Sequence, residues 1–171
     1  MKLTNMNESL IWLEIPDIVE TQVRKEKGMI IGGKAVQAQL GLFSRPSYDF
    51  DVFSLNPKQS ARRLEKKLDR RSGENLFYHK PISEHPSTIK VLYIGDDHKQ
   101  NTYDDQTVAD FTPFRPTRET KINGTRYMHI DSIVKEKEAI LREKRYSFRH
   151  SKDRGDINLI RQVTSLQRKR G

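Results

Sequence analysis

The stretch between residues 29 and 53 restricts the fold of this chain more than any other part of the sequence. A short apolar run there leads directly into Gly32 and Gly33, and a segment long enough for a helix follows. A second short strand is then predicted to carry Asp49 and Asp51. Because side chains alternate between the two faces of a strand, both carboxylates should point the same way. The pattern predicts a strand, a glycine turn, a helix and a second strand in succession.

This unit has the chemistry of a phosphate and metal site. Two carboxylates side by side repel each other, and a fold tolerates them more easily when a divalent cation lies between them. The paired glycines let the backbone approach a phosphate where the next helix presents unpaired N–H groups and its positive dipole end. The sequence therefore predicts an enzyme that handles a nucleoside triphosphate, with Asp49 and Asp51 as ligands of Mg²⁺ or Mn²⁺.

Two-metal phosphoryl transfer usually requires a third carboxylate from a neighbouring strand. Asp110 is the first candidate, because it lies inside the apolar run 108–111, where an unpaired carboxylate is unfavourable. The acids of the polar loop that precedes this strand compete for the role, although a solvated loop also accounts for them. These competing acids are Asp96, Asp97, Asp104 and Asp105.

In this order the motifs resemble the nucleotidyltransferase superfamily, typified by DNA polymerase beta and tRNA nucleotidyltransferases. Within it the likeness is closest to the small toxin-type members, the AbiEii-like and MenT-like proteins. Those share an Arg-x-(Thr/Ser)-x-Asp-x-Asp run, matched here from Arg45 to Asp51. They also carry a late lysine, an arginine and a (Lys/Arg)-Asp-x-x-Asp motif. The matching residues here are Lys137, Arg145, Lys152, Asp153 and Asp156.

The resemblance implies a nucleotide-binding role for several further residues. Gly32, Gly33 and Lys34 would hold the triphosphate, although the family often has Ser or Thr at the third of these positions. Arg45 would neutralise the triphosphate or pair with Asp49. A second departure is Val108, which stands two residues before Asp110 where the toxin-type members tend to have lysine.

The resemblance also implies that the late motif serves the nucleotide. Lys137 would contact the phosphates, and Lys152 and Asp153 would belong to the nucleotide site. Asp153 with Asp156 would organise the helix packing or the site. Purely structural roles stay open for two of these residues. Lys137 could form a surface salt bridge with Glu138, and Asp153 could cap a helix that begins there.

The expected fold is one α+β domain, a mixed β-sheet flanked by helices. Its core should span about 28–128, followed by a helical part at about 129–166 and a basic tail at 167–171. Pro16 should break or restart the first helix, and Asn123-Gly124 should turn a hairpin. The predicted helices cover residues 5–27, 34–42, 57–71, 131–144 and 153–166. The predicted strands cover residues 28–31, 48–53, 75–79, 88–94, 107–113, 120–122 and 125–128.

Composition restricts location and partners. The chain of 171 residues has no cysteine, no run of about twenty apolar residues and no secretory leader pattern, so we expect a cytoplasmic protein. The net charge is +9, and twelve Lys or Arg face five acids between residues 135 and 171. This charge suits a polyanionic partner, although a solvated helix face and a frayed tail would also explain it.

The sequence thus favours a metal-dependent nucleotidyltransferase. It would transfer a nucleoside monophosphate from a nucleoside triphosphate to an acceptor hydroxyl, with RNA, including tRNA 3′ ends, as the favoured acceptor. Two alternatives stay open: an enzyme that nucleotidylates a protein, and an inactive nucleotide- or nucleic-acid-binding module on the same fold. A toxin neutralised by a protein partner is a further possible biological role.

Overall fold

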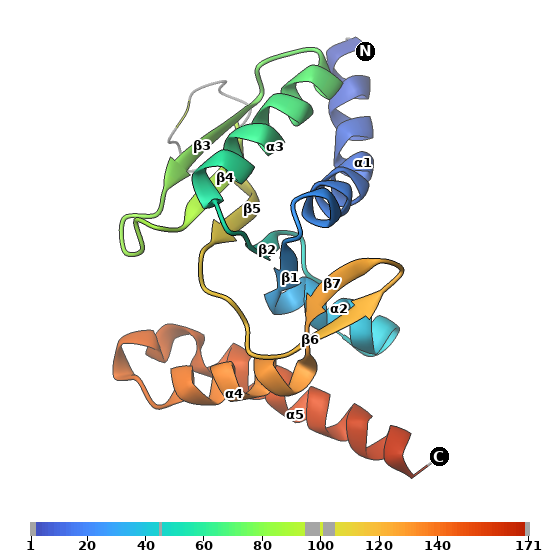
Figure 1. Ribbon diagram of the computed structural model, residues 1–171, viewed down its shortest axis with the longest axis vertical. Coiled ribbons are helices and arrows are strands. Elements are labelled where there is room, and N and C mark those ends of the chain that lie inside the picture. The colour runs from blue at the N-terminus through green and yellow to red at the C-terminus, as the bar shows by residue number, and fades with distance from the viewer. Residues whose placement is uncertain (1–2, 45, 95–99, 101–104, 170–171) are drawn as a thin grey trace.

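A computed structural model describes residues 3–44, 46–94, 100 and 105–169, and these form a seven-stranded mixed sheet with helices on both sides (Figure 1). The strand order is β3-β4-β5-β2-β1-β7-β6. The strands are β1 (Met29–Ile31), β2 (Phe50–Phe53), β3 (Phe77–Pro81), β4 (Ile89–Tyr93), β5 (Gln106–Thr112), β6 (Glu119–Ile122) and β7 (Thr125–Met128). The α-helices are α1 (Leu3–Lys25), α2 (Gly32–Leu40), α3 (Pro57–Ser72), α4 (Ile130–Leu141) and α5 (His150–Arg168), with short 3₁₀ turns at Gly41–Phe43 (η1) and Lys144–Arg149 (η2). The expected α+β class is confirmed.

The centre of the sheet brings together strands that are distant in sequence. Strand β2 lies between β1, with which it pairs antiparallel, and β5, with which it pairs parallel. In this register Asp51 is opposite Ile31 on one side and Asp110 on the other. Because directly paired residues share a face of the sheet, the two aspartates lie on the same face.

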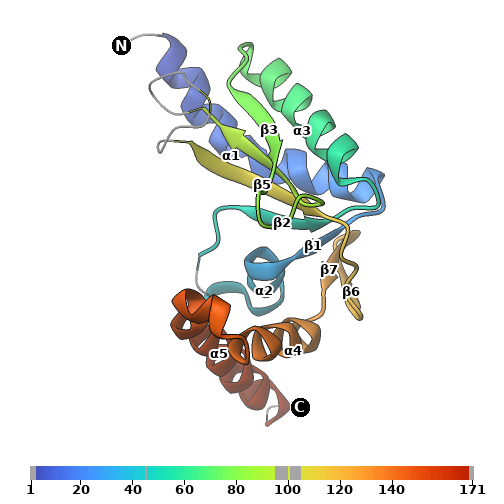
Figure 2. The same ribbon diagram turned by 90° about the vertical axis from the view of Figure 1, so that its left-hand side faces the viewer.

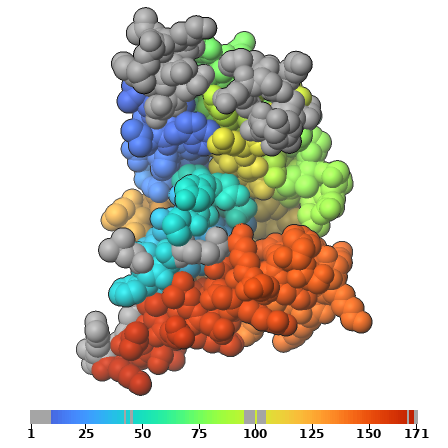
Figure 3. Space-filling model, turned by 180° about the vertical axis from the view of Figure 1, so that it is seen from behind, coloured from blue at the N-terminus to red at the C-terminus, as the bar shows by residue number. Residues whose placement is uncertain are grey.

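The helices form layers on the two faces of this sheet. Helices α1 and α3 pack against each other and cover one face, whereas α2 lies on the other side beside β1 and β2 (Figure 2). Helices α4 and α5 pack together beyond α2 and form one end of the molecule, as the space-filling view from behind also shows (Figure 3). The charges of Glu136 on α4 and Arg149 in η2 act on Asp51, so the face that carries Asp51 and Asp110 looks toward the C-terminal helices.

Helix α1 continues through Pro16, so the predicted break is wrong. Proline in a helix interior removes one hydrogen bond and costs about 3 kcal/mol. Four apolar side chains at helical spacing are almost fully buried on one side of α1, and each contributes about 1.5 to 3 kcal/mol of burial. Their packing offsets the proline. They are Ile11, Ile15, Val19 and Val23.

Local signals predicted other boundaries well. Helix α3 begins after Asn56, whose side chain accepts a hydrogen bond from the Gln59 amide, and it ends at Gly73 in the left-handed conformation. The predicted hairpin is confirmed: Asn123 and Gly124 both have positive φ, at 48° and 82°, as a type I′ turn requires.

Two boundaries differ in ways that affect the site. Strand β2 begins at Phe50, so Asp49 precedes the strand and is exposed instead of lying within it. Helix α5 begins at His150, and Asp153 therefore lies in its first turn and does not cap it. In both cases residues near an element's end follow packing that the local sequence does not reveal. No helix within the described residues is long and apolar enough to cross a membrane.

Candidate active site

Asp51 and Asp110 form the centre of the candidate site. They are register partners on the parallel strands β2 and β5, and both are partly buried. Burial raises the pKa of Asp51 to about 7, and the negative charges of Asp49 and Asp110 act in the same direction. The Arg149 guanidinium opposes this rise. All three predicted carboxylates are thus close enough to influence one another, with Asp49 on the solvent side.

Asp110 has one carboxylate oxygen in contact with a cation and one without any partner. Its Oδ2 lies 3.9 Å from Nζ of Lys90, its register partner on β4. Its Oδ1 is buried and has no hydrogen-bond partner among the described residues. Burial raises the pKa of Asp110 to about 6, with Lys90 opposing this effect and Asp49 adding to it. A buried, unpartnered carboxylate oxygen is unfavourable on its own and suits a ligand position.

The paired glycines lie directly against this site. Gly32 has a φ of +60°, and a Cβ placed on it would overlap the Asp51 carboxylate. A Cβ on Gly33 would lie 2.5 Å from the Ser47 hydroxyl oxygen. No larger residue fits either position without displacing the neighbouring side chain. The strand-to-helix turn and the carboxylate strand thus form one tightly packed unit, with the N-terminus of α2 beside Asp51.

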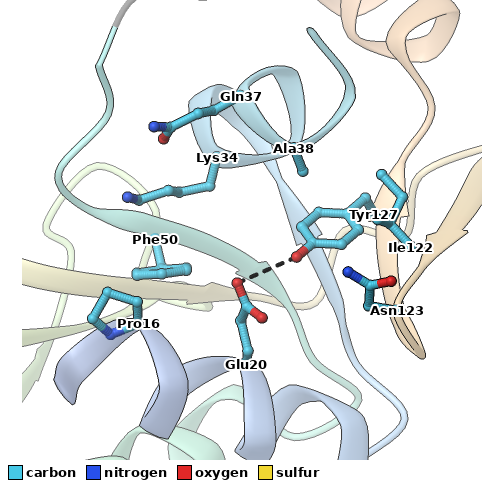
Figure 4. Close-up of a pocket in the computed structure, with 9 residues that line it drawn as sticks. All are labelled: Pro16, Glu20, Lys34, Gln37, Ala38, Phe50, Ile122, Asn123 and Tyr127. Carbon is cyan, nitrogen blue, oxygen red and sulfur yellow. Dashed lines mark hydrogen bonds between the residues drawn. The ribbon is translucent and has the colours of Figure 1, made fainter. Parts of the chain in front are cut away.

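The side chain of Lys34 points away from the turn that Gly32 and Gly33 form against Asp51 and Ser47. Its Nζ lies 4.9 Å from the centre of the Phe50 ring, in a cavity of about 400 Å³ between α1, α2 and the β6–β7 turn (Figure 4). Phe50 alternates with Asp51 along β2 and therefore faces the α1 side of the sheet. Burial lowers the pKa of Lys34, whereas Asp49 and Glu20 oppose this. Its predicted contact with the triphosphate stays a prediction.

The late motif forms a buried ion cluster between α4 and α5. The Lys137 ammonium lies 2.6 Å from Oδ1 of Asp153 and 2.9 Å from Oδ2 of Asp156. Asp153 is fully buried and also accepts a 2.9 Å hydrogen bond from Nε of Arg149. Burial raises the pKa of Asp153, but the bonds from Lys137 and Arg149 outweigh it and the net effect is a lower pKa. Lys137 and Asp153 thus join the two helices, and their predicted contact with nucleotide stays a prediction.

Arg149 is a site residue that the sequence alone did not predict. Asp153 fixes its guanidinium from one turn onward, and its positive charge reaches Asp51. The i to i+4 spacing of Arg149 and Asp153 is the signal that could have identified it. Two other predicted residues of this region, Lys152 and Arg145, are exposed, and Arg145 pairs with Glu143 at 2.6 Å.

Arg45 and the loop acids Asp96, Asp97 and Asp104 lie outside the described residues. The fourth loop acid, Asp105, accepts a hydrogen bond from the Tyr78 hydroxyl. This bond gives Asp105 a partner in the sheet, whereas one buried oxygen of Asp110 has none within the described ranges.

Two adjoining cavities, each of about 420 Å³, open on the carboxylate face. The first, which we call the Arg149 cavity, is lined by Arg149, Tyr146 and Thr88. The second, the Ile31 cavity, is lined by Ile31 and Lys135, and Ile31 is the register partner of Asp51. The two cavities share three lining residues, namely Thr112, Phe114 and Glu136.

Thr112 shows that these cavities and the carboxylates share one face. It lies two residues after Asp110 on β5, and alternation places the two side chains on the same side of the strand. A ligand in either cavity would therefore lie on the same face of the sheet as the carboxylates. The combined space is appropriate for a nucleotide-sized molecule.

The donor set at the centre of the site fits a divalent cation. Mg²⁺ and Mn²⁺ prefer oxygen ligands, and Asp51 and Asp110 present carboxylate oxygens, one of which is buried and lacks a partner among the residues described. Within the described ranges, no three acidic or histidine side chains are arranged to hold one ion. The structure thus brings together the pair Asp51 and Asp110, and Asp49 as a third ligand stays a prediction.

Comparison with known proteins identifies the fold. No protein-family model matches the chain, and no curated protein matches it either. Among solved structures it is similar to the Megavirus polyadenylate synthase, with a TM-score of 0.64 and 16% identity over 90% of this chain and 31% of that one. It is also similar to JHP933 from Helicobacter pylori, with a TM-score of 0.50 and 12% identity over 82% of this chain and 59% of that one.

These likenesses define the chain as a protein with a nucleotidyltransferase-like fold. The chain spans about a third of the length of the Megavirus enzyme and less than two thirds of JHP933. At such low identity the comparison concerns the fold and does not single out the toxin-type members within it. The arrangement of Asp51, Asp110 and the paired glycines carries the functional argument beyond the fold.

Proposed function

We propose that this protein is a metal-dependent nucleotidyltransferase that moves a nucleoside monophosphate from a nucleoside triphosphate to an acceptor hydroxyl. One observation carries the proposal. Two carboxylates from parallel neighbouring strands meet against a glycine turn at a helix N-terminus, and one of their oxygens is buried with no partner in the part of the chain that the structure describes. The fold shared with the solved structures supports this assignment, and the chemistry of the carboxylate pair Asp51 and Asp110 agrees with it.

Each part of the site has a role in this reaction. The Gly32-Gly33 turn would receive phosphate oxygens through its backbone amides. Arg149, held by Asp153, would neutralise the triphosphate from the opposite wall. Asp51 and Asp110 would hold the divalent cations, which when bound align the phosphates and balance their charge.

The reaction itself is an in-line displacement at the α-phosphorus. An acceptor hydroxyl oxygen forms a new bond to the α-phosphorus, and the bond from that phosphorus to the oxygen bridging to the β-phosphate breaks. Pyrophosphate leaves with the electron pair of the broken bond, and the hydroxyl proton passes to the medium. Catalysis rests on positioning and on charge neutralisation, which this set of side chains can supply.

RNA is the acceptor class that we favour. The net charge of +9 and the twelve cations after residue 134 suit a polyanion better than a small neutral acceptor. The likeness to a polyadenylate synthase, by fold, agrees with this choice. A protein acceptor would not need so large an excess of positive charge near the site.

The proposal is tested by supplying each labelled nucleoside triphosphate with Mg²⁺ or Mn²⁺ and total RNA. The wild-type protein should place label on RNA, and the Asp51→Asn, Asp110→Asn double variant should not. Asp17→Asn, which removes an exposed acid of α1 beside α3, is the control and should retain transfer. Label on protein would point to nucleotidylation of a protein, and binding of nucleotide without any transfer would favour an inactive module.

A further inference from the structure

A third cavity extends the space beside the carboxylates along the C-terminal helices. This groove of about 610 Å³ lies between α4 and α5, and we call it the α4–α5 groove. It shares Lys135 with the Ile31 cavity, which in turn borders Asp51 through Ile31. The α4–α5 groove and the Ile31 cavity thus meet at Lys135, and the lining of the groove extends along α5 to Arg168 and Lys169. These helices form one end of the molecule (Figure 3).

The α4–α5 groove is strongly basic. Its lining contains five cations and two acids. Arg118 pairs with Asp131 at 2.8 Å, and Arg161 pairs with Glu138. The remaining three cations have no carboxylate partner among the described residues. These three are Lys135, Arg168 and Lys169.

We propose that the α4–α5 groove binds the single-stranded segment of an acceptor RNA that precedes the reacting 3′ end. Lys135, Arg168 and Lys169 would contact successive phosphates, and the terminal nucleotide would enter the Ile31 cavity. Phe114 lines that cavity and is 65% exposed, so a base can stack on its ring. This inference rests on the proposed function and adds the track by which the acceptor reaches the site.

The outer surface of α3 is the competing basic surface. It carries many Lys and Arg side chains, but three of them already have partners: Arg63 with Glu26, Arg71 with Glu14, and Lys67 with the Gln22 side chain. The full set of Lys and Arg side chains on α3 is Lys58, Arg62, Arg63, Lys66, Lys67, Arg70 and Arg71.

Position also argues against α3 as the acceptor track. Helix α3 covers the face of the sheet opposite to Asp51 and Asp110 (Figure 2). An RNA bound on α3 would have to pass around the sheet to reach the carboxylates. The α4–α5 groove instead adjoins the Ile31 cavity at Lys135, and it is therefore the surface that the geometry assigns to the acceptor.

The test compares two charge-matched triple variants in an Asp110→Asn background, so that binding is read without transfer. One is Lys135→Ala, Arg168→Ala, Lys169→Ala in the groove. The other is the control Lys58→Ala, Arg62→Ala, Lys66→Ala, three exposed positions on α3. Fluorescence anisotropy with a labelled single-stranded RNA of about 20 nucleotides measures the Kd between about 50 and 200 mM salt.

The groove variant should raise the Kd roughly 10- to 100-fold and reduce the slope of log K against log salt by about 2, as expected for three lost phosphate contacts on a single strand. The control should change the Kd less than about 2-fold. Equal thermal unfolding curves would show that both variants fold. An unchanged Kd in the groove variant, or an equal loss in the α3 variant, would overturn the assignment. Failure of nucleotidyl transfer in wild type would refute the proposed function alone, because this binding test uses no triphosphate.

Discussion

Replacement of Asp51 by asparagine should stabilise the folded protein at alkaline pH while it removes activity. The carboxylate is partly buried, close to Asp49 and Asp110, and its ionised form is unfavourable in the metal-free protein. Asparagine has nearly the same shape and carries no charge. A site that holds repelling carboxylates for a cation thus reduces stability for the sake of function.

The size of the effect follows from the pKa. The pKa of Asp51 rises from 3.8 to about 7 on folding, and each factor of ten in proton affinity corresponds to about 1.4 kcal/mol. Ionised Asp51 therefore destabilises the fold by about 4 kcal/mol at most. Because its charge is coupled to those of Asp49 and Asp110, we expect Asp51→Asn to raise the free energy of unfolding by about 2 to 4 kcal/mol.

The sign of the pH dependence follows from proton linkage. Between pH 3.8 and about 7 the folded protein keeps a proton on Asp51 that the unfolded chain has released. The free energy of unfolding of wild type therefore falls as pH rises through this window, and the full loss is present above about pH 7. Below pH 3.8 the carboxylate is protonated in both states, and the advantage of Asp51→Asn should vanish.

Urea unfolding of metal-free protein at pH 8 and pH 5 measures this difference. Asp17→Asn, at an exposed position, is the control and should change stability by less than about 0.5 kcal/mol. Added Mg²⁺ should raise the unfolding midpoint of wild type more than that of Asp51→Asn. If Asp51→Asn is less stable than wild type at pH 8, ionised Asp51 does not destabilise the fold. If Mg²⁺ raises the unfolding midpoints of both proteins equally, Asp51 does not bind the cation.

Three further predictions concern single residues. Gly33→Ala should reduce nucleotide binding, measured by calorimetry, because its Cβ would displace the Ser47 hydroxyl. The control Gly155→Ala on α5 has space for a Cβ and should leave the free energy of unfolding unchanged or raise it by up to about 1 kcal/mol. Lys137→Met should lower the free energy of unfolding by about 3 to 5 kcal/mol, since it leaves Asp153 and Asp156 without their shared cation; a loss under about 1 kcal/mol would contradict the buried cluster. Asn56→Ala should cost about 1 kcal/mol in urea unfolding through the lost cap of α3, and an unchanged midpoint would show that the cap contributes nothing.

Much of the fold could be predicted from local sequence signals. Asn56 with Pro57, and Asn123 with Gly124, act through their own backbone conformation, so α3 and the hairpin were found at the correct places. The break at Pro16 was predicted from the same kind of rule and failed. Burial of the α1 face in the folded protein outweighs the local preference for a break, and no local signal reports it.

The candidate site was predictable where one strand or one turn supplies the residues. Asp51 and the paired glycines were found together, and the apolar surroundings of Asp110 identified it as a buried carboxylate. The role of Arg149 was missed: its pairing with Asp153 is local, but its position near Asp51 depends on the tertiary fold. Lys137 was interpreted as a surface or phosphate-binding residue, and its burial between two acids is likewise a result of tertiary packing.

The amount of pyrophosphate formed per nucleotide transferred tests the proposed nucleotidyl transfer most directly. Purified protein, Mg²⁺, the preferred labelled triphosphate and acceptor RNA are mixed, and both products are followed over one turnover. The account predicts equal amounts of pyrophosphate and labelled RNA, with both reduced at least about 1,000-fold by Asp110→Asn. Release of orthophosphate in place of pyrophosphate, or transfer that persists in Asp110→Asn, would contradict it.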